Sequence, residues 1–96
     1  MNQDDKLRAI TKYFGIETEL TKFSEEVGEL LNECYKYYFK GGNTNNIEDE
    51  LADVLVIFTQ ICLYFNVDMD KVEAITNEKI DRTSKRIEEG WYDKHR

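Results

Sequence analysis

Two groups of carboxylates are the side chains in this sequence whose types and spacing could do chemistry. The first group is Glu25, Glu26 and Glu29, and the second is Glu50 and Asp53. On a helix with about 100° per residue, positions three apart lie about 60° from each other and share a face. Carboxylate oxygens grouped in this way are the ligands that a hard divalent cation such as Mg²⁺ prefers.

An apolar stripe lies beside each of two acidic pairs, Glu26 with Glu29 and Glu50 with Asp53. The stripe beside the first pair contains Phe23, Val27, Leu30, Leu31, Cys34 and Tyr38. The stripe beside the second pair contains Ile47, Leu51, Val54, Leu55, Phe58, Ile61, Cys62 and Phe65. If the two stripes pack antiparallel, four carboxylates converge at the rim of one core. For any single acid, an ordinary solvated flank is the alternative, but the matching register on both segments favours a shared cation site.

The elements that must position these groups are helices. The chain contains no proline, and its glycines, apart from Gly28, fall where the helical apolar periodicity breaks. We predict four helices, over about 4–14, 17–40, 47–65 and 69–89. Asn45 followed by Glu48 predicts a capping box for the third helix, and Asp68 is a candidate N-cap for the fourth. We therefore expect one all-α domain over residues 1–96, folded as an antiparallel four-helix bundle.

Composition limits the classes of protein to which this chain can belong. Its 96 residues include 20 acidic and 13 basic side chains, and the formal net charge of -7 disfavours binding to a nucleic-acid polymer. Cys34 and Cys62 are expected to be buried free thiols, and the single histidine, His95, cannot supply a zinc or di-iron site. Because the sequence shows no leader and no long apolar run, we expect a cytoplasmic protein without a membrane segment.

A basic stripe on the fourth expected helix complements the acids. Lys79, Arg82 and Arg86 lie within about 60° of one another on the helix surface. Such a stripe can hold phosphate oxygens, and arginine can bind them with two parallel hydrogen bonds. The alternative is ion pairing with surface acids of the same helix, namely Glu78, Asp81, Glu88 and Glu89.

Aromatic side chains gather in the run from Tyr35 to Phe39, around more than one helix face. One chain cannot bury all of them against a single helix side, so a subunit interface is the favoured interpretation. Stacking of one ring on a nucleotide base is the alternative. Trp91 also has two candidate roles, clamping a base or sealing the end of the bundle.

At the acidic motifs the sequence resembles the MazG-like all-α nucleoside triphosphate pyrophosphohydrolases. This superfamily includes dimeric dUTPases, dCTP pyrophosphatases and phosphoribosyl-ATP pyrophosphohydrolases. Its signature, E-E-x-x-E followed by E-x-x-D, stands here as Glu25-Glu26-Val27-Gly28-Glu29 and Glu50-Leu51-Ala52-Asp53. The resemblance covers about residues 18–86, and one departure is Asn46, where some members carry a lysine.

The resemblance implies Mg²⁺-dependent hydrolysis of a nucleoside triphosphate, expected to be a deoxynucleotide or a non-canonical one, to the monophosphate and pyrophosphate. It implies that Glu25 orients or activates the attacking water and that the Lys79-x-x-Arg82 part of the fourth helix meets phosphates. The implied metal ligands are Glu26, Glu29, Glu50 and Asp53. It also implies a homodimer or homotetramer. The alternative function is a non-catalytic helical interaction or regulatory module. No residue indicates which nucleotide base is preferred.

Overall fold

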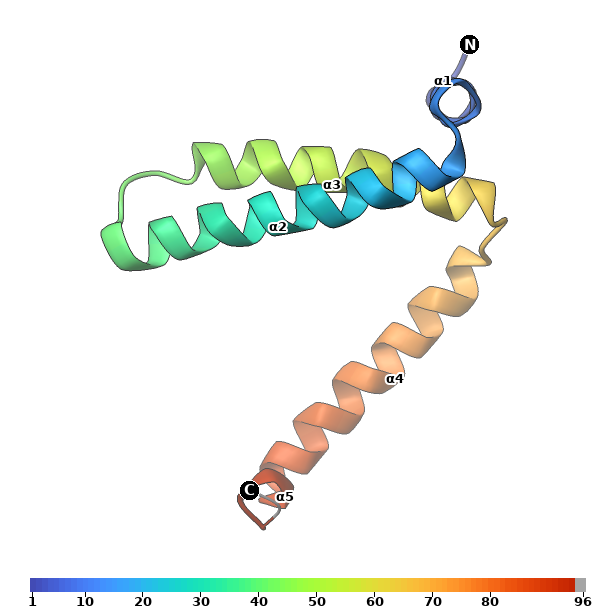
Figure 1. Ribbon diagram of the computed structural model, residues 1–96. Coiled ribbons are helices and arrows are strands. Elements are labelled where there is room, and N and C mark those ends of the chain that lie inside the picture. The colour runs from blue at the N-terminus through green and yellow to red at the C-terminus, as the bar shows by residue number, and fades with distance from the viewer. Residues whose placement is uncertain (95–96) are drawn as a thin grey trace. The chain divides into compact units, whose positions relative to one another are not determined.

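The computed structural model describes residues 1–94, which form helices and short connections (Figure 1). The helices are α1 (Gln3–Phe14), α2 (Ile16–Lys40), α3 (Asn45–Tyr64), α4 (Met69–Glu88) and α5 (Trp91–Lys94). The single histidine, His95, lies outside the described residues. The chain divides into two compact units, Met1–Asn66 and Val67–Arg96. The all-α class is confirmed.

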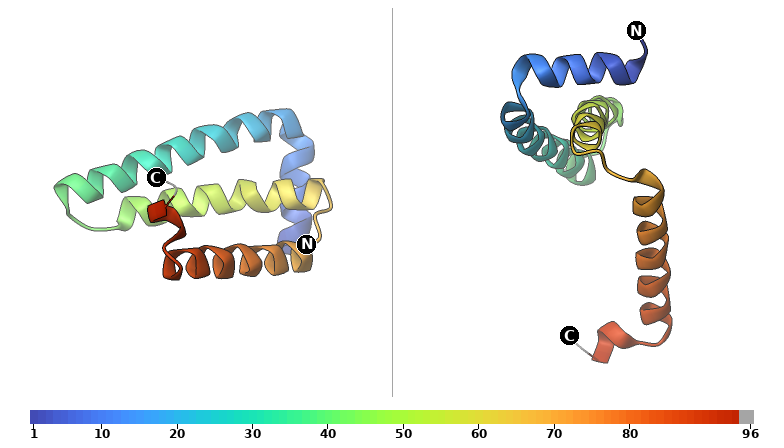
Figure 2. Two further views of the ribbon diagram at one scale, coloured as in Figure 1. Left: turned by 90° about the horizontal axis from the view of Figure 1, so that it is seen from below. Right: turned by 90° about the vertical axis from the view of Figure 1, so that its right-hand side faces the viewer.

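In the first unit, α2 and α3 form a long antiparallel hairpin, as the apolar stripes predict (Figure 2). Helix α1 lies across the end of the hairpin at which α2 begins and α3 ends. The buried apolar side chain of this unit is Ile57, which is 2% exposed. Thr11, Glu19 and Gln60 are buried with it. The packing of all four long helices into one bundle stays a prediction.

Local signals explain where the helices of the first unit begin and end. The side chain of Asn2 accepts a hydrogen bond from the amide of Asp5 at 2.8 Å and so caps α1. Gly15, at φ 90°, ends α1 and precedes α2, and Gly41, at φ 74°, ends α2. Both backbone conformations favour glycine because a Cβ atom would be strained there.

The capping box predicted at Asn45 is wrong. Asn45 is the first residue of α3, and its N–H donates to Oδ1 of Asn43 at 3.0 Å. Thr44 is the N-cap residue, and its hydroxyl donates to Oε1 of Glu48 at 2.9 Å. The side chain of Asn43 reaches the backbone two residues on, as asparagine commonly does in turns, and this sets the start of the helix earlier than predicted.

The second unit consists of α4 and α5. Asp68 caps α4 as predicted, because its Oδ1 accepts from the amide of Lys71 at 3.1 Å. Gly90, at φ 68°, follows the helix, and α5 comes directly after it. Helix α5 was not predicted, because a helix of four residues is too short to show a periodicity. Within this unit no residue of α4 is buried.

Neither cysteine is as deeply buried as expected. Cys34 and Cys62 are free, in agreement with the prediction, but both are half-buried. Among residues 1–94, no single helix is long and apolar enough to cross a membrane. Counted together, α3 and α4 have the length and the composition of a membrane-spanning segment, but neither helix has them alone.

Candidate metal centre

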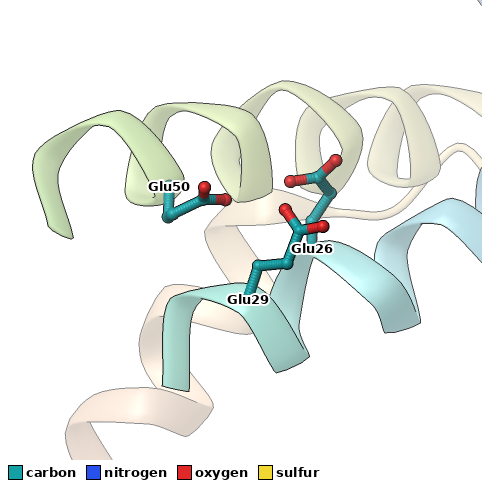
Figure 3. A group of neighbouring side chains, drawn as sticks. All are labelled: Glu26, Glu29 and Glu50. Carbon is teal, nitrogen blue, oxygen red and sulfur yellow. The ribbon is translucent and has the colours of Figure 1, made fainter. Parts of the chain in front are cut away.

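Three carboxylates meet between the two helices of the hairpin. Glu26 and Glu29 come from α2, and Glu50 comes from α3 (Figure 3). One oxygen atom from each of the three lies within 4.8 Å of the others. The antiparallel packing of α2 against α3 brings them together, since the two motifs lie on opposite sides of the 41–44 connection. Three of the four acids predicted to converge therefore lie close together.

A second group of acids shares Glu50 with the first. Asp49, Glu50 and Asp53 of α3 also place carboxylate oxygens within 4.8 Å of one another. The fourth predicted acid, Asp53, thus joins the others through Glu50. Asp49 was not predicted from the sequence. A signal was present, because residues four apart, such as Asp49 and Asp53, face the same side of a helix.

Two carboxylate oxygens in these groups are buried without a partner. Oε2 of Glu26 and Oε2 of Glu50 are shielded from solvent, and no described residue donates a hydrogen bond to either. Ionised carboxylates offer only acceptors, so the neighbouring acids cannot satisfy each other. A buried acceptor without a donor is unfavourable. A proton or a cation would relieve this, and an all-oxygen donor set suits a hard divalent cation.

The pKa values of the two half-buried acids report the same crowding. Desolvation by burial, followed by the charge of Glu29 and the neighbouring carboxylates, raises the pKa of Glu50 to about 7. The pKa of Glu26 is also raised, first by desolvation and then by the charges of Glu29 and Asp53. In the absence of a cation, protons therefore bind to this centre closer to neutral pH than to an ordinary carboxylate.

Glu25, the predicted catalytic residue, lies beside the acid groups rather than in them. It is exposed and borders a cavity of about 500 Å³ on α2. Glu26 borders the same cavity, together with Thr18, Thr21 and Lys22. The cavity therefore adjoins the acid groups through the side chain of Glu26.

The predicted phosphate-binding residues, Lys79, Arg82 and Arg86, all lie on α4 of the second unit. Lys79 and Arg82 are exposed, whereas the Arg86 guanidinium lies 4.8 Å from the centre of the Trp91 ring. Trp91 thus packs on a cation of its own unit. The alternative of ion pairing along α4 is found at a different residue, since Lys85 meets Glu89 at 4.0 Å.

The aromatic run on α2 is exposed on the single chain. Tyr38 is 79% exposed and Phe39 is 75% exposed. Tyr35 stacks on Phe39 with ring centroids 6.4 Å apart. As expected, one chain does not bury these rings.

A protein-family model described as the MazG nucleotide pyrophosphohydrolase domain matches residues 14–87. The match includes all of α2 and α3 and therefore both acid groups. Comparisons with curated proteins and with solved structures gave no match.

Proposed function

The chain belongs to the MazG nucleotide pyrophosphohydrolase family, and on that premise we propose that it hydrolyses a nucleoside triphosphate with the help of Mg²⁺. The products are the nucleoside monophosphate and pyrophosphate, and the substrate is a deoxynucleotide or a non-canonical nucleotide. The convergence of Glu26, Glu29 and Glu50, with two buried carboxylate oxygens lacking donors, carries the proposal. A purely structural module would have no use for such an arrangement, which is unfavourable without a cation.

The proposed ligands of Mg²⁺ are Glu26, Glu29, Glu50 and Asp53. The donor set supports this assignment because it consists of oxygen atoms only and because Glu29 and Asp53 are exposed. Exposure at this rim leaves room for water and phosphate oxygens, which Mg²⁺ usually keeps among its ligands. When bound, Mg²⁺ neutralises phosphate charge and acidifies water.

We assign Glu25 to the attacking water. A carboxylate beside the acid groups can accept a hydrogen bond from water, orient it and take up its proton. The water oxygen then bonds to phosphorus, the bond between the α- and β-phosphates breaks, and pyrophosphate leaves. The cavity that Glu25 and Glu26 share supports this role, because it is open to water beside the proposed ligands. Placement and electrostatic stabilisation are the contributions of the protein.

Lys79, Arg82 and Arg86 are the proposed phosphate contacts, supported by the exposure of Lys79 and Arg82 and by the preference of phosphate for such side chains. We propose that residues 1–96 act as one domain and assemble as a homodimer or homotetramer. The exposed rings of Tyr38 and Phe39 support assembly. The proposed compartment is the cytoplasm, where free cysteines stay reduced.

A panel of nucleotides with product analysis tests the reaction. The protein is incubated with Mg²⁺ and each ribonucleoside, deoxyribonucleoside or modified triphosphate, and products are separated by anion exchange. We expect equal amounts of monophosphate and pyrophosphate, and no reaction in EDTA. Orthophosphate as the first product would contradict the proposal. Size-exclusion chromatography with light scattering tests assembly, and a strict monomer would contradict it.

A further inference from the structure

A second cavity, lined by polar and apolar side chains, lies in the first unit at the corner where α1 crosses the hairpin. Its volume is about 450 Å³, and the residues that line it include Arg8, Thr11, Lys12, Gln60, Leu63 and Tyr64. We propose that it is a binding site for a nucleoside monophosphate, separate from the acid groups. Gln60 and Glu50 lie ten residues apart on α3, which corresponds to about 15 Å along the helix. The proposal does not require the chain to hydrolyse anything.

Two cations face this cavity without a counter-ion. Arg8 and Lys12 lie four residues apart on α1 and both line the cavity. Like charges at this spacing repel each other mildly. Among residues 1–94, no carboxylate lies within ion-pair distance of either, although the chain has a formal net charge of -7. A phosphate monoester, which carries close to two negative charges at neutral pH, matches this pair of cations.

The start of α2 adds to the positive character of the cavity. Gly15 is the N-cap of α2 and lines the cavity with Ile16, and no side chain caps this end of the helix. Free amides at a helix N-terminus favour an anion. The acids in the first turn of α2, Glu17 and Glu19, do not line this cavity. The phosphate is therefore expected between the two cations and the start of α2.

Gln60 provides a fixed hydrogen-bond acceptor in the same cavity. Its side chain is 1% exposed, and its Nε2 donates to Oγ1 of Thr11 at 2.9 Å. The Thr11 hydroxyl in turn donates to the carbonyl oxygen of Leu7 at 3.0 Å, so its oxygen can only accept from Gln60. This fixes the orientation of the Gln60 amide. No described residue donates to its Oε1, which suits an N–H group on a ligand.

An aromatic wall completes the site. Tyr64, which is 55% exposed, and Leu63 line the cavity on the α3 side. A flat ring can stack on tyrosine while its edge meets a hydrogen-bond acceptor. The volume lies within the range of about 300–1,000 Å³ that is usual for small-molecule sites and greatly exceeds what phosphate alone needs. A nucleoside monophosphate combines the charge, the ring and the N–H donor that these residues call for.

Calorimetric titration of the full chain in EDTA tests the proposal, because chelation prevents phosphate from binding through metal at the acid groups. The probes are AMP, GMP, CMP and UMP, with inorganic phosphate and the matching nucleosides for comparison. We expect at least one monophosphate to bind saturably and at least tenfold more tightly than phosphate or its own nucleoside. Absence of saturable monophosphate binding would overturn the proposal.

Variants locate the binding. The double change Arg8→Gln and Lys12→Gln should weaken monophosphate binding at least tenfold, whereas Lys6→Gln, an exposed position on the same helix, should not. Tyr64→Ala should weaken monophosphate binding several-fold and leave phosphate binding unchanged. Undiminished binding by the double variant would overturn the proposal. So would a change in oligomeric mass without a change in binding, because the cavity would then be a subunit contact.

The two proposals fail separately. Glu26→Gln should leave monophosphate binding in EDTA unchanged, and its loss would place the ligand at the acid groups and overturn the second site. If the nucleotide panel shows no hydrolysis while monophosphate binding in EDTA persists, the proposed enzyme activity is wrong and the second site stands.

Discussion

The hairpin of α2 and α3 encloses polar side chains at two places, and the two differ in whether the neighbouring side chains can donate hydrogen bonds to one another. Near α1, Gln60 donates to Thr11 and Thr11 donates to Leu7, so a donor meets an acceptor in both bonds, and Oε1 of Gln60 accepts from no described residue. Farther along the hairpin, Glu26 and Glu50 are both acceptors, and one oxygen of each has no donor among the described residues. The first arrangement is neutral and joins donors to acceptors within the chain, while the second is charged and needs a proton or a cation.

This difference separates a structural use of buried polarity from a functional one. A neutral hydrogen-bonded pair contributes to stability independently of pH and of metal. Crowded carboxylates oppose folding until something neutralises them, and such arrangements concentrate at functional sites. The Thr11–Gln60 pair should therefore matter for stability and the acid groups for activity, and five experiments test that division.

The largest expected effect is on turnover. Glu29→Gln or Asp53→Asn removes a charged ligand from the acid groups while leaving a side chain of similar shape. We expect metal-dependent hydrolysis to fall at least about a hundredfold, with helical content by circular dichroism unchanged. Glu48→Gln, on α3 outside both acid groups, is the matched control and should retain activity. Undiminished turnover in the first two variants would remove these residues from the site.

The next largest effect is stabilisation by metal. At a Mg²⁺ concentration about a hundred times its Kd, the free energy of unfolding should rise by about 2.7 kcal/mol. For a chain of this size that corresponds to a rise in Tm of about 10 °C or more. The rise should vanish when Glu26→Gln and Glu50→Gln are combined and should persist in Gln60→Leu. Equal shifts in these two variants would mean that the acid groups and the Thr11–Gln60 pair do not differ in their dependence on metal.

The third effect concerns the hydrogen-bonded pair of Thr11 and Gln60. Thr11→Val leaves the amide of Gln60 buried without its acceptor, which should lower the free energy of unfolding by about 1–3 kcal/mol. Adding Gln60→Leu removes the stranded amide as well, so the double variant should lose less than the sum of the single losses. Chemical denaturation with and without Mg²⁺ measures both quantities. A loss that depended on Mg²⁺ would contradict the division between the two places.

The sequence predicted the acid groups better than the Thr11–Gln60 pair, for a physical reason. The spacing within each acidic motif places its carboxylates on one helix face, so Glu26, Glu29, Glu50 and Asp53 could be singled out before any packing was known. Gln60 and Thr11 lie 49 residues apart, and their contact exists only because α1 crosses the hairpin. No local pattern marks such a pair or the cavity beside it.

Helix boundaries followed a similar rule. Where one side chain decides the end, as at Asp68 and Gly41, the prediction was correct. At the start of α3, the side chains of Asn43 and Thr44 both form hydrogen bonds with residues of the helix. Residue propensity alone could not show which of these two residues is the N-cap. One oxygen of Glu50 is buried, and this burial raises the pKa of Glu50. The burial could not be predicted from the sequence either, because it depends on how closely α2 approaches α3.

The fourth effect is a pH dependence in the metal-free protein. The pKa of Glu50 is raised from 4.5 to about 7 by folding, so between these values the folded state binds more protons than the unfolded state. Stability should therefore fall as pH rises from 4.5 to 7 and then level off. Thermal unfolding in EDTA across this range measures it.

Two variants assign that pH dependence to Glu50. Glu50→Gln should flatten the profile and raise the Tm of the metal-free protein above pH 7, whereas Glu73→Gln, an exposed position on α4, should do neither. A metal-free Tm that rose between pH 4.5 and 7 would contradict the raised pKa of Glu50. Saturating Mg²⁺ should also reduce the slope, since the cation replaces the proton.

The smallest effect tests how open the surface beside the acid groups is. Gly28 lies within α2 between the acids, and a Cβ atom there would meet nothing within 4 Å. Because glycine destabilises a helix interior, Gly28→Ala should raise the free energy of unfolding by about 0.5–1 kcal/mol. Gly41→Ala, at φ 74°, is the contrasting control and should destabilise. If Gly28→Ala destabilised as well, another copy of the chain would have to pack against α2 at this point, and the acid groups would lie at a subunit contact instead of an open surface.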